Sequence, residues 1–418
     1  NEACVTRNIG VIYQPVELEL IRDGLDPDFY PNVDWSNVIL KNGAGSYRAN
    51  LNINGGGSTA RYYVSVAYTE DQGMYKTDDT LKKDYNTNAN YKRWNYRMNV
   101  DVDVTKTTRL SFGLAGWLDK RNSPGLGDDN EWGELFGYNA VATPIVYSNG
   151  YIPMKWRNEN QMNPWVAATQ TGYNENWDNS IQTNIQLDQD LAFITNGLKF
   201  TGRFGYDTNN YNNIYRRQWP DMYKANGRDG NGNILWDHVY TAQAMTQSSD
   251  NSGDRHEFID LLLNYDRSFF KVHNTGFTLR YTQDSKVQTQ NIGTDIKNGV
   301  SRRNQGLAGR FTYNYNMRYF FDFNFGYTGS ENFAKGHRFG FFPAYSFAWN
   351  LTGEKFISDN FKWIDMLKVR YSHGKVGNDN LGDSNRFPYL YTISEGGSGY
   401  NFGGLSTSSN SFGGAYYS

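Results

Sequence analysis

The chain is poor in the residue types on which many catalytic and metal sites depend. It has 418 residues but only one cysteine, Cys4, and five histidines. One cysteine excludes an internal disulfide and disfavours a thiolate metal site. No stretch approaches eighteen consecutive apolar residues, so the sequence contains no transmembrane helix. The formal net charge of −2 argues against nucleic acid as the main partner, because proteins that bind it usually carry a basic excess.

Two polar stretches come nearest to a catalytic or metal site. Residues 127–134 (GDDNEWGE) offer several carboxylates, but their spacing does not match a calcium loop, and a solvated acidic loop is favoured. Residues 227–233 (GRDGNGN) place Asp229, Asn231 and Asn233 at alternate positions, where a glycine-rich turn is favoured over a calcium site. The sequence therefore predicts a protein that is not an enzyme, with no catalytic residues, no metal and no cofactor.

What the chain does have is a two-residue alternation of apolar and polar side chains. In one segment Tyr96, Met98, Val100, Val102 and Val104 alternate with Asn95, Arg97, Asn99, Asp101 and Asp103. Because successive side chains of a strand point to opposite faces, this segment is a strand with one apolar and one polar surface. A soluble sandwich buries the apolar surface, whereas a membrane barrel turns it to lipid and turns the polar surface to a wet lumen.

The alternation recurs often enough to favour the barrel. It is found again at 181–188, 198–207, 259–266, 277–282, 310–315 and 321–327. Strands of about ten residues suit a tilted crossing of a bilayer. A composition of 38% hydrophobic and 16% aromatic residues, with a mean hydropathy of −0.73, fits a wall in which only every second residue is apolar. The predicted fold is all-β, an antiparallel up-and-down transmembrane β-barrel in the bacterial outer membrane.

The expected connections differ on the two sides of the sheet. The predicted strands are 46–54, 60–70, 90–104, 107–119, 180–193, 197–212, 236–248, 255–268, 275–290, 302–315, 318–329, 340–351 and 364–376. Short turns between them alternate with long loops at 71–89, 120–179, 213–235 and 291–301. Long loops on one side only are typical of outer-membrane barrels, in which the long loops are extracellular.

Aromatic side chains gather near the ends of the predicted strands. They are Tyr62, Tyr63, Tyr68, Tyr91, Trp94, Trp117, Tyr206, Tyr319, Tyr327, Trp349 and Trp363. Tyrosine and tryptophan favour the level of the lipid headgroups, where the ring is half apolar and its polar tip is wet. The sequence therefore predicts an aromatic girdle, with ordinary strand aromatics as the alternative.

Two sets of side chains are candidates for contact with a transported molecule. Tryptophan faces stack on sugar rings while amides and carboxylates bond hydroxyls, and a peptide can use the same surface. The loop tryptophans are Trp132, Trp156, Trp165, Trp177, Trp219 and Trp236. The alternative is that they pack the loops against each other or against a partner. The predicted lumen-facing charges are Arg97, Asp101, Arg203, Arg280 and Arg310.

Ordered motifs along the chain resemble the SusC/RagA family of TonB-dependent outer-membrane transporters. Residues 32–38 (NVDWSNV) and 61–73 (RYYVSVAYTEDQG) resemble its early barrel segment. Its mid-barrel run is matched by 309–321 (GRFTYNYNMRYFF), 337–349 (HRFGFFPAYSFAW), 354–356, 367–382 (LKVRYSHGKVGNDNLG) and 386–389 (RFPY). One departure is 330–335 (SENFAK), where the family commonly has a serine-serine-arginine-phenylalanine-glycine-like stretch.

The resemblance implies a fold, a function and partners. The fold is a barrel of about 22 strands whose lumen holds a plug domain. The function is import of oligosaccharides or peptides, powered from the inner membrane by the TonB complex, which pulls on the plug. A SusD-like surface lipoprotein caps the barrel from outside and contacts the long loops.

The chain divides, on this interpretation, into three parts. Residues 1–45 are a lead-in segment and the start of the barrel, 46–380 are barrel strands with the long loops, and 381–418 are an extracellular loop region. No basic and then apolar signal segment begins the chain, and its end is rich in glycine and serine. We therefore expect an internal piece of a longer barrel, without the plug. The rival interpretation is a secreted β-rich glycan-binding or adhesin protein that buries its apolar faces between sheets.

Overall fold

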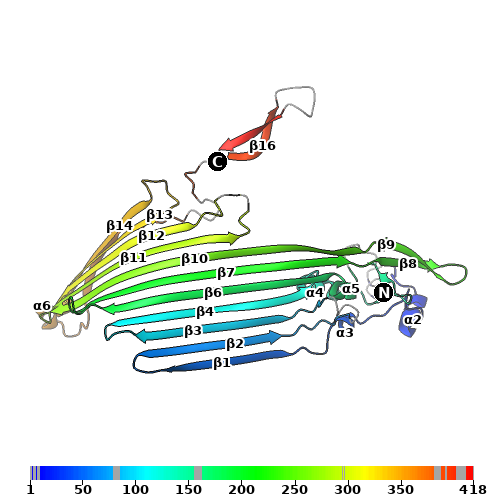
Figure 1. Cartoon of the computed structure of the whole chain (residues 1–418), viewed down its shortest axis with the longest axis horizontal. Coiled ribbons are helices and arrows are strands. Elements are labelled where there is room, and N and C mark those ends of the chain that lie inside the picture. Colours follow the sequence, from blue (N-terminus) through cyan, green and yellow to red (C-terminus); the bar gives the residue numbers. More distant parts are fainter. Residues whose placement is uncertain are drawn as a thin grey trace.

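A computed structural model of the chain is dominated by one large antiparallel sheet, with most of the helices at one of its ends (Figure 1). The structure describes Glu2, Thr6 and residues 10–78, 85–154, 162–293, 295, 297–380, 387–390, 393–401 and 411–417. No helix in this described part is long and apolar enough to cross a membrane.

Twelve strands form the main sheet, and every neighbouring pair is antiparallel. In spatial order they are β1 (Ser46–Gly56), β2 (Ala60–Asp71), β3 (Tyr91–Asp103), β4 (Thr108–Pro124), β6 (Gly172–Asp190), β7 (Leu198–Trp219), β10 (Gln243–Phe269), β11 (His273–Gln290), β12 (Arg302–Tyr315), β13 (Tyr319–Ser330), β14 (Phe339–Asn350) and β15 (Lys368–Gly374). The up-and-down antiparallel arrangement predicted from the alternation is confirmed. Within the described strands, β1 and β15 are the edges of the sheet.

The remaining elements are short and most of them lie in the long connections. The helices are α2 (Pro15–Asp23), α3 (Trp35–Ile39), α4 (Asp128–Gly137), α5 (Pro164–Thr169), the 3₁₀ turn η1 (Leu351–Gly353) and α6 (Lys355–Ser358). A small sheet joins β5 (Ile152–Pro153), β8 (Met222–Arg228) and β9 (Ile234–Tyr240). A separate hairpin pairs β16 (Ile393–Asn401) with β17 (Ser411–Tyr417).

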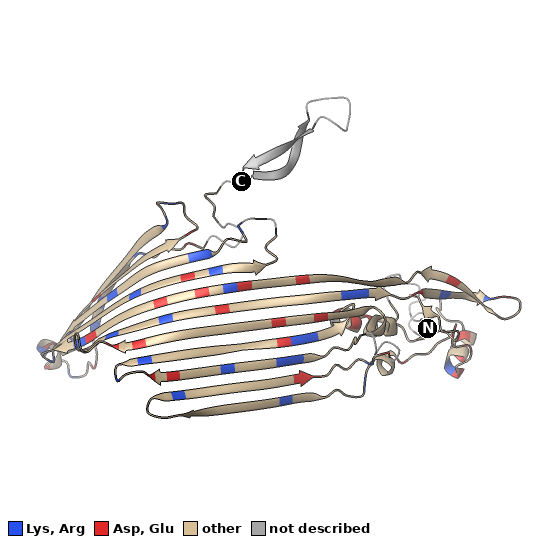
Figure 2. Cartoon of the chain, viewed as in Figure 1, with Lys and Arg blue, Asp and Glu red and all other residues tan. Residues whose placement is uncertain are grey.

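The register of the main sheet sorts its side chains into two faces. Arg97 of β3 lies opposite Ser65 of β2 and Ala115 of β4, and the same register continues strand by strand to β15. One face is thereby mainly polar, although on β14 it carries Phe342, Ala344 and Ala348. Charged residues lie along the length of most of the strands rather than only at their ends (Figure 2). The other face carries the apolar members of each alternation.

The apolar face of the sheet is exposed. Leu51 of β1 and Phe341 of β14 are 61% and 56% exposed, and apolar side chains on strands between them are exposed as well. Among the described residues, no buried hydrophobic side chain belongs to the twelve-stranded sheet. A sandwich would bury this face against a second sheet, whereas a barrel wall presents it to lipid.

The turns at one end of the sheet are short, as predicted. Two of them, at Phe270–Lys271 and Asn316–Met317, have two consecutive residues with positive φ. This is the geometry of a type I′ turn, which matches the twist of the strands it joins. Most of the long connections lie at the opposite end, together with α3, α4 and α5, whereas the connection between β14 and β15, which contains η1 and α6, lies at the short-turn end (Figure 1).

The strands are longer at the long-loop end than the alternation indicates. The expected loop 120–179 is shorter because β4 continues to Pro124 and β6 begins at Gly172, and the loop 213–235 is shorter because β7 runs to Trp219. The expected separate strands 236–248 and 255–268 are wrong. The structure has β9 and then one continuous strand, β10, from Gln243 to Phe269. These extensions are polar on both faces, so no alternation marks them.

Two further expectations fail for local reasons. Residues 127–134 are not a solvated acidic loop, because 128–134 belong to α4, in which Glu131 is buried. Leu135 in α4 and Tyr138 just after the helix give this segment an apolar side, which packs against α3 and α5. The segment 381–418 is not loop throughout, since β16 and β17 lie within its described residues.

The predicted aromatic girdle divides between the faces. Tyr63, Tyr91 and Trp117 share the polar face with Arg97 by register, so these three do not meet lipid. At the short-turn end of the apolar face, the ring of Tyr319 stacks on Tyr315 and on Trp349. Glu354 accepts hydrogen bonds from the Tyr319 hydroxyl at 2.8 Å and from Trp349 Nε1 at 3.1 Å, which gives these rings the wet polar edge that a girdle position has.

We predict that arginine is poorly tolerated on the apolar face. Val100→Arg in β3 or Phe323→Arg in β13 should lower the free energy of unfolding by about 2–4 kcal/mol where the site lies near the bilayer midplane. The measurement is urea unfolding of the complete protein in lipid vesicles. Asn99→Arg, one position along β3 on the polar face, is the matched control. Equal losses for Val100→Arg and Asn99→Arg would contradict the assignment of faces.

Candidate functional site

The polar face is hollowed at the long-loop end of the sheet. Two cavities, with volumes of about 530 and 910 Å³, both include Asp178 of β6 and Tyr211 of β7 in their walls, so they form one continuous groove. We call this surface the polar groove. It crosses from β2 to β12, and every strand residue in it named below has the parity of the polar face.

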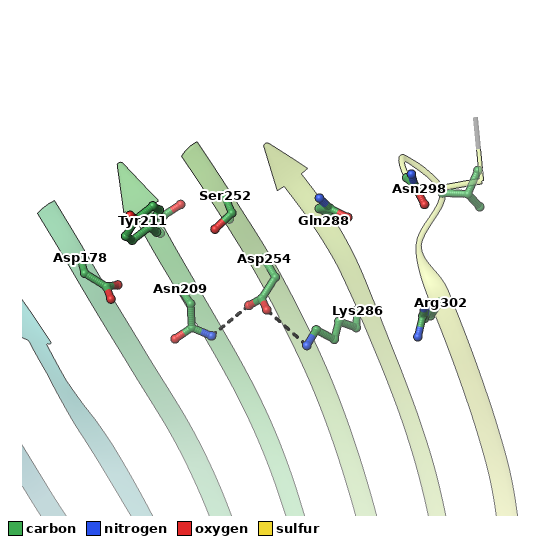
Figure 3. A pocket seen from close by; sticks show the side chains of 12 residues that line it. Asp178, Asn209, Tyr211, Ser252, Asp254, Lys286, Gln288, Asn298 and Arg302 are labelled. Atoms are coloured by element: carbon green, nitrogen blue, oxygen red, sulfur yellow. Dashed lines mark hydrogen bonds and ion pairs between the residues drawn. The ribbon is translucent and has the colours of Figure 1, made fainter. Parts of the chain in front are cut away.

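The part of the groove nearest β12 is lined by amides and by charges of both signs (Figure 3). Asp254 of β10 is at its centre. Its Oδ1 accepts a hydrogen bond from Asn209 Nδ2 at 2.9 Å, and its Oδ2 lies 3.2 Å from Lys286 Nζ. Gln288 and Arg302 complete this side of the wall. Such a surface offers both donors and acceptors to a polar ligand.

The part of the groove nearest β2 is richer in acceptors. Asp119 of β4 lies directly opposite Asp178 in the register, and the Tyr91 hydroxyl donates to Asp119 Oδ2 at 3.3 Å. Asn174 is held by its amide nitrogen, which donates to the carbonyl oxygens of Pro124 at 2.9 Å and of Gly125 at 3.3 Å. Asp71 and Asp129 also line this side.

The predicted lumen-facing charges all lie on the polar face, nearer its short-turn end. Asp260 of β10 is 1% exposed and forms ion pairs with two arginines. Arg280 Nε donates to Asp260 Oδ1 at 2.8 Å and Arg280 Nη2 donates to its Oδ2 at 3.2 Å, while Arg203 Nη1 donates to Oδ2 at 3.4 Å. Arg310 makes a two-pronged pair with Asp322, at 2.9 and 2.8 Å. These contacts cross-link neighbouring strands.

The other two predicted charges lie on β3. Asp101 accepts a hydrogen bond from Ser111 Oγ at 2.5 Å. Arg97 lines a separate depression of about 340 Å³ together with Ser65 and Gln182. The structure therefore brings all five predicted side chains to one face, but it does not gather them into one site. That they line a lumen stays a prediction.

Above the groove, the long connections fold into a small unit with a hydrophobic core. We call it the loop cap, and it comprises the described residues within 26–45, 72–78 and 125–171. Its core contains Trp35 and Ile39 of α3, Tyr75, and Leu135 and Tyr138 at the end of α4. The ring of Tyr138 meets Trp35 edge-on with 5.4 Å between centroids. Burial raises the pKa of the Tyr138 hydroxyl to about 12, because ionisation is disfavoured away from water.

The β8–β9 hairpin is tied to the loop cap. Arg228 Nη2 donates to Asp26 Oδ1 at 2.7 Å, and the ring of Trp236 contacts those of Tyr147 and Tyr151, with centroids 4.8 and 5.3 Å away. Connections that are far apart in the sequence thus form one structure at the long-loop end. Sequence reasoning treated them as separate loops.

Most of the predicted tryptophans pack against other side chains and do not line the polar groove. Trp165 packs on the loop-cap core, and Trp219 packs on a second cluster formed by Met162, Val166 and Ala167. Trp177 lies on the opposite face of β6 from Asp178, and Lys120 Nζ lies over its ring at 4.5 Å. None of the five described tryptophans lines the two cavities, and Trp156 lies outside the described residues.

Trp132 is the most open of these side chains. It is 38% exposed, and its ring is stacked on Phe136, itself 77% exposed, with 5.5 Å between centroids. This pair forms an aromatic patch on the outer side of α4. Contact of any of the six tryptophans with a transported molecule stays a prediction.

The stretch 227–233 forms the turn between β8 and β9. Asp229 accepts hydrogen bonds from the Asn233 side chain and from the backbone N–H groups of Asn233 and Asn231. These bonds, the Asn233 side chain first, hold the pKa of Asp229 below its usual range. Its carboxylate oxygens are thus used by the turn. In the described part of the chain, no three histidine, cysteine or carboxylate side chains are placed to hold a metal ion.

Comparison with known proteins supports one family. No family model matches the chain. TonB-dependent receptor P3 of Formosa agariphila is 25% identical over 366 residues, covering 84% of this chain and 34% of the relative. TonB-dependent receptor SusC of Bacteroides thetaiotaomicron is 24% identical over 432 residues, covering 94% of this chain and 40% of the relative. The chain thus spans between a third and two fifths of the length of these curated relatives.

Solved structures agree on the fold. The chain aligns with the RagAB peptide transporter at a TM-score of 0.53 and 14% identity, covering 93% of this chain and 41% of the solved one. It aligns with the RagAB peptide importer in its closed-closed state at a TM-score of 0.54 and 14% identity, covering 99% and 46%. The twelve-stranded sheet therefore corresponds to part of a barrel wall, which confirms the predicted fold class.

The Arg203–Asp260–Arg280 cluster should stabilise the wall. Asp260→Asn leaves two guanidinium groups facing a neutral amide, and we predict a loss of about 1–3 kcal/mol in the free energy of unfolding. Asp322→Asn, which breaks a more exposed pair on the same face, is the control and should cost less than about 1 kcal/mol. The measurement is denaturant unfolding in vesicles. A larger loss for Asp322→Asn than for Asp260→Asn would refute this ranking.

Proposed function

We propose that the chain, which is similar to TonB-dependent receptors such as SusC, belongs to the SusC/RagA family and forms part of the barrel wall of an importer in the bacterial outer membrane. The complete protein would take up oligosaccharides or peptides with energy delivered through TonB. The observation that carries this proposal is the twelve-stranded sheet with two different faces, one apolar and exposed and the other mainly polar. Proteins of this family are transporters and not enzymes, in line with the lack of a catalytic pair in the sequence.

The proposal concerns the complete barrel rather than this sheet alone. In a bilayer an unpaired strand edge leaves backbone N–H and C=O groups without partners, which costs several kcal/mol for each group. The outer edges of β1 and β15 therefore require further strands. A plug and a segment that contacts TonB, both implied by the family, would complete the transport cycle.

The side chains of the polar groove favour the proposal that the transported molecule is large and polar. Its walls are built mainly from asparagine, aspartate, glutamine and tyrosine side chains with a few cations. Amides and carboxylates bind the hydroxyls of sugars and equally the N–H and C=O groups of peptides. One solved relative is named a peptide transporter, and the groove chemistry here fits both classes of cargo.

The loop cap offers a surface on which a partner protein could bind from outside. The exposed Trp132–Phe136 patch lies on α4, at the long-loop end of the sheet. Aromatic side chains that are stacked and exposed are enriched at the centres of protein interfaces. We infer that a SusD-like surface lipoprotein contacts this patch.

Deletion of the gene should abolish uptake of a specific set of oligomers. We expect the deletion strain to lose growth on at least one oligosaccharide or peptide mixture as sole source, and to keep growth on its monomers. Depletion of TonB should reproduce the loss. Growth measured on a panel of oligomers tests this, with the gene restored in trans as the control. Unchanged growth on every oligomer would argue against an import role.

Substitution in the aromatic patch should weaken the capping partner. Phe136→Asp places a charge where an apolar contact is expected, and we predict at least about a tenfold weaker complex, since a central aromatic contact contributes roughly 2 kcal/mol or more. Copurification of the lipoprotein with the barrel is the measurement. Val239→Asp, the same change at another exposed apolar position, on β9 and 45% exposed, is the control. Full recovery of the partner with Phe136→Asp would remove this patch from the interface.

A further inference from the structure

We propose that residues 246–252 of β10 bind a transported peptide in extended form, which pairs with the strand through its backbone. The ligand class is therefore an unfolded peptide and not an oligosaccharide. The inference rests on the proposed function in that it takes the ligand to be the imported molecule. It adds a mode of binding that neither the sequence motifs nor the relatives assign.

The pairing of β10 is asymmetric at its long-loop end. Towards β7, residues 246–252 pair without interruption with residues 217–211. Towards β11, the pairing ends at Gly253, which lies opposite Gln290. Among the described strands, none pairs with 246–252 on that side, and β7 and β10 continue together past the end of β11 (Figure 1). We call this unpaired side of residues 246–252 the free edge.

The chain leaves β10 at this point for a local reason. Asn291, directly after β11, has a φ of 51°, and a strand does not continue through a left-handed residue. Gln288 Nε2 fixes the turn, since it donates to the carbonyl oxygens of Gln290 at 3.2 Å and Asn291 at 3.1 Å. Further on, Asn298 Nδ2 donates to the carbonyl oxygen of Ile292 at 3.0 Å. The described part of this connection thus closes on itself, and no ladder joins it to β10.

The free edge presents a row of backbone donors and acceptors. In an antiparallel ladder, alternate residues direct their N–H and C=O groups to one neighbour, and the residues between them direct these groups to the other side. About half of residues 246–252 therefore direct both groups away from β7, at a repeat of about 6.8 Å. An extended peptide reproduces this repeat, whereas an oligosaccharide has no such row. The free edge therefore favours a polypeptide ligand.

The free edge lacks the features that commonly protect an edge strand. Natural edges are shielded by lysine, proline or a bulge. Residues 246–252 (TQSSDNS) contain no lysine or proline, and Asp250 is their one charge. No register shift falls within them, and every side chain except that of Asn251 is exposed. The backbone of the free edge is thus open to an incoming strand.

The free edge leads into the polar groove. Ser252 and Gly253 line the cavity of about 530 Å³, together with Gln288 at the end of β11 and Asn298 in the connection that follows (Figure 3). The cavity therefore lies where β11 separates from β10. A peptide beside residues 246–252 takes the line of β11 beyond its end, so that one end of the peptide reaches the cavity. This continuity favours a transported molecule over a strand of a partner protein.

The side chains along the free edge favour binding of varied sequences. When a strand adds to a sheet, its backbone gives affinity, and pockets for alternate side chains give specificity. Ser248, Ser249 and Ser252 are small and exposed, so they build no walls for such pockets. Affinity then comes mainly from the backbone. A site of this kind accepts peptides of different sequence, which suits an importer of peptide mixtures.

The test is hydrogen exchange of the complete receptor, isolated with its partner, measured by mass spectrometry. The probe is a seven-residue peptide of alternating threonine and glutamine, blocked at both ends. With free peptide at about ten times its Kd, we expect the amides of the free edge to exchange about tenfold more slowly. Residues 261–265 pair with both β7 and β11, and their exchange should not change.

Two chemical controls test the role of the backbone. The same peptide with every backbone nitrogen methylated keeps its side chains but has no N–H donor, and it should bind at least about tenfold more weakly. Maltoheptaose is a neutral oligosaccharide with the same number of units. It should leave the exchange of residues 246–252 unchanged.

A pair of variants locates the contact. Ser248→Pro and Ser249→Pro each remove one N–H group, and consecutive residues direct these groups to opposite sides. One variant therefore loses a bond to β7, and the other loses a donor of the free edge, where proline is compatible with folding. We expect the second variant to keep the parent's heat-modifiable migration and to bind the peptide about fivefold to tenfold more weakly.

Several results would overturn the proposal. They are unchanged exchange of residues 246–252 with peptide present, equal slowing by the methylated peptide or by maltoheptaose, and no peptide binding at about 1 mM. Unchanged peptide affinity in both proline variants would also overturn it. Loss of the copurifying partner from the folded variant, with peptide affinity unchanged, would assign the free edge to that partner instead.

The proposed function and this inference fail separately, because binding is measured apart from uptake. Slowed exchange without any growth defect in the deletion strain would reject the import role alone. Import of oligosaccharides with unchanged exchange of residues 246–252 would reject the peptide strand alone.

Discussion

The pairing register is the constraint on which the rest of the structure depends. Side chains alternate faces with a period of two, so a slip of one residue between any two strands would move every later apolar side chain to the polar face. No such slip interrupts the ladders from β1 through β7 and β10 to β15 along their shared central lengths. The irregularities in β10, between Gln243 and Thr246 and between Gly253 and Asp254, lie near the long-loop end. Type I′ turns at Phe270–Lys271 and Asn316–Met317 help fix the register locally.

The two faces then have different sources of stability. The apolar face gains nothing from a core, because in this sheet it is exposed, and its stabilisation must come from lipid. The polar face is held by cross-strand contacts such as Arg280–Asp260 and Arg310–Asp322. Under the proposed function, these charge-assisted bonds would also fix where a transported molecule meets positive or negative charge. The groove and the loop cap lie at the long-loop end of the sheet, beyond the parts of the strands in which apolar and polar residues alternate.

The fold was largely readable from the sequence, and the site largely was not. Alternation as in Tyr96–Val104 marks a strand only while one face must be apolar. At the long-loop ends of β6, β7 and β10 most side chains on both faces are polar. Residues such as Asn174, Asn209 and Asp254 therefore belong to no apolar–polar alternation. These are the residues of the groove. The position of Arg97, Arg203 and Arg280 on the polar face could be predicted, because the two-residue alternation alone determines the face of each side chain.

The loop cap was missed for a related reason. Its core joins Trp35, Tyr75 and Tyr138 from three separate connections, and contacts of such long sequence separation leave no local pattern. The five described tryptophans are divided between this core, a second cluster around Met162, the β8–β9 hairpin, the apolar-parity face of β6 and an exposed patch on α4. Composition identified the residue type, but only the packing shows which of these side chains remains open.

The central claim is that one face of this sheet meets lipid and the other meets water. Spin labels introduced one at a time along β3 of the complete protein in vesicles measure it most directly, by their accessibility to oxygen dissolved in lipid and to a water-soluble nickel complex. The account predicts a period of two. Labels at Met98, Val100 and Val102 should be oxygen-accessible, and labels at Asn99 and Asp101 should be nickel-accessible. Equal access of the nickel complex to both sets would contradict it.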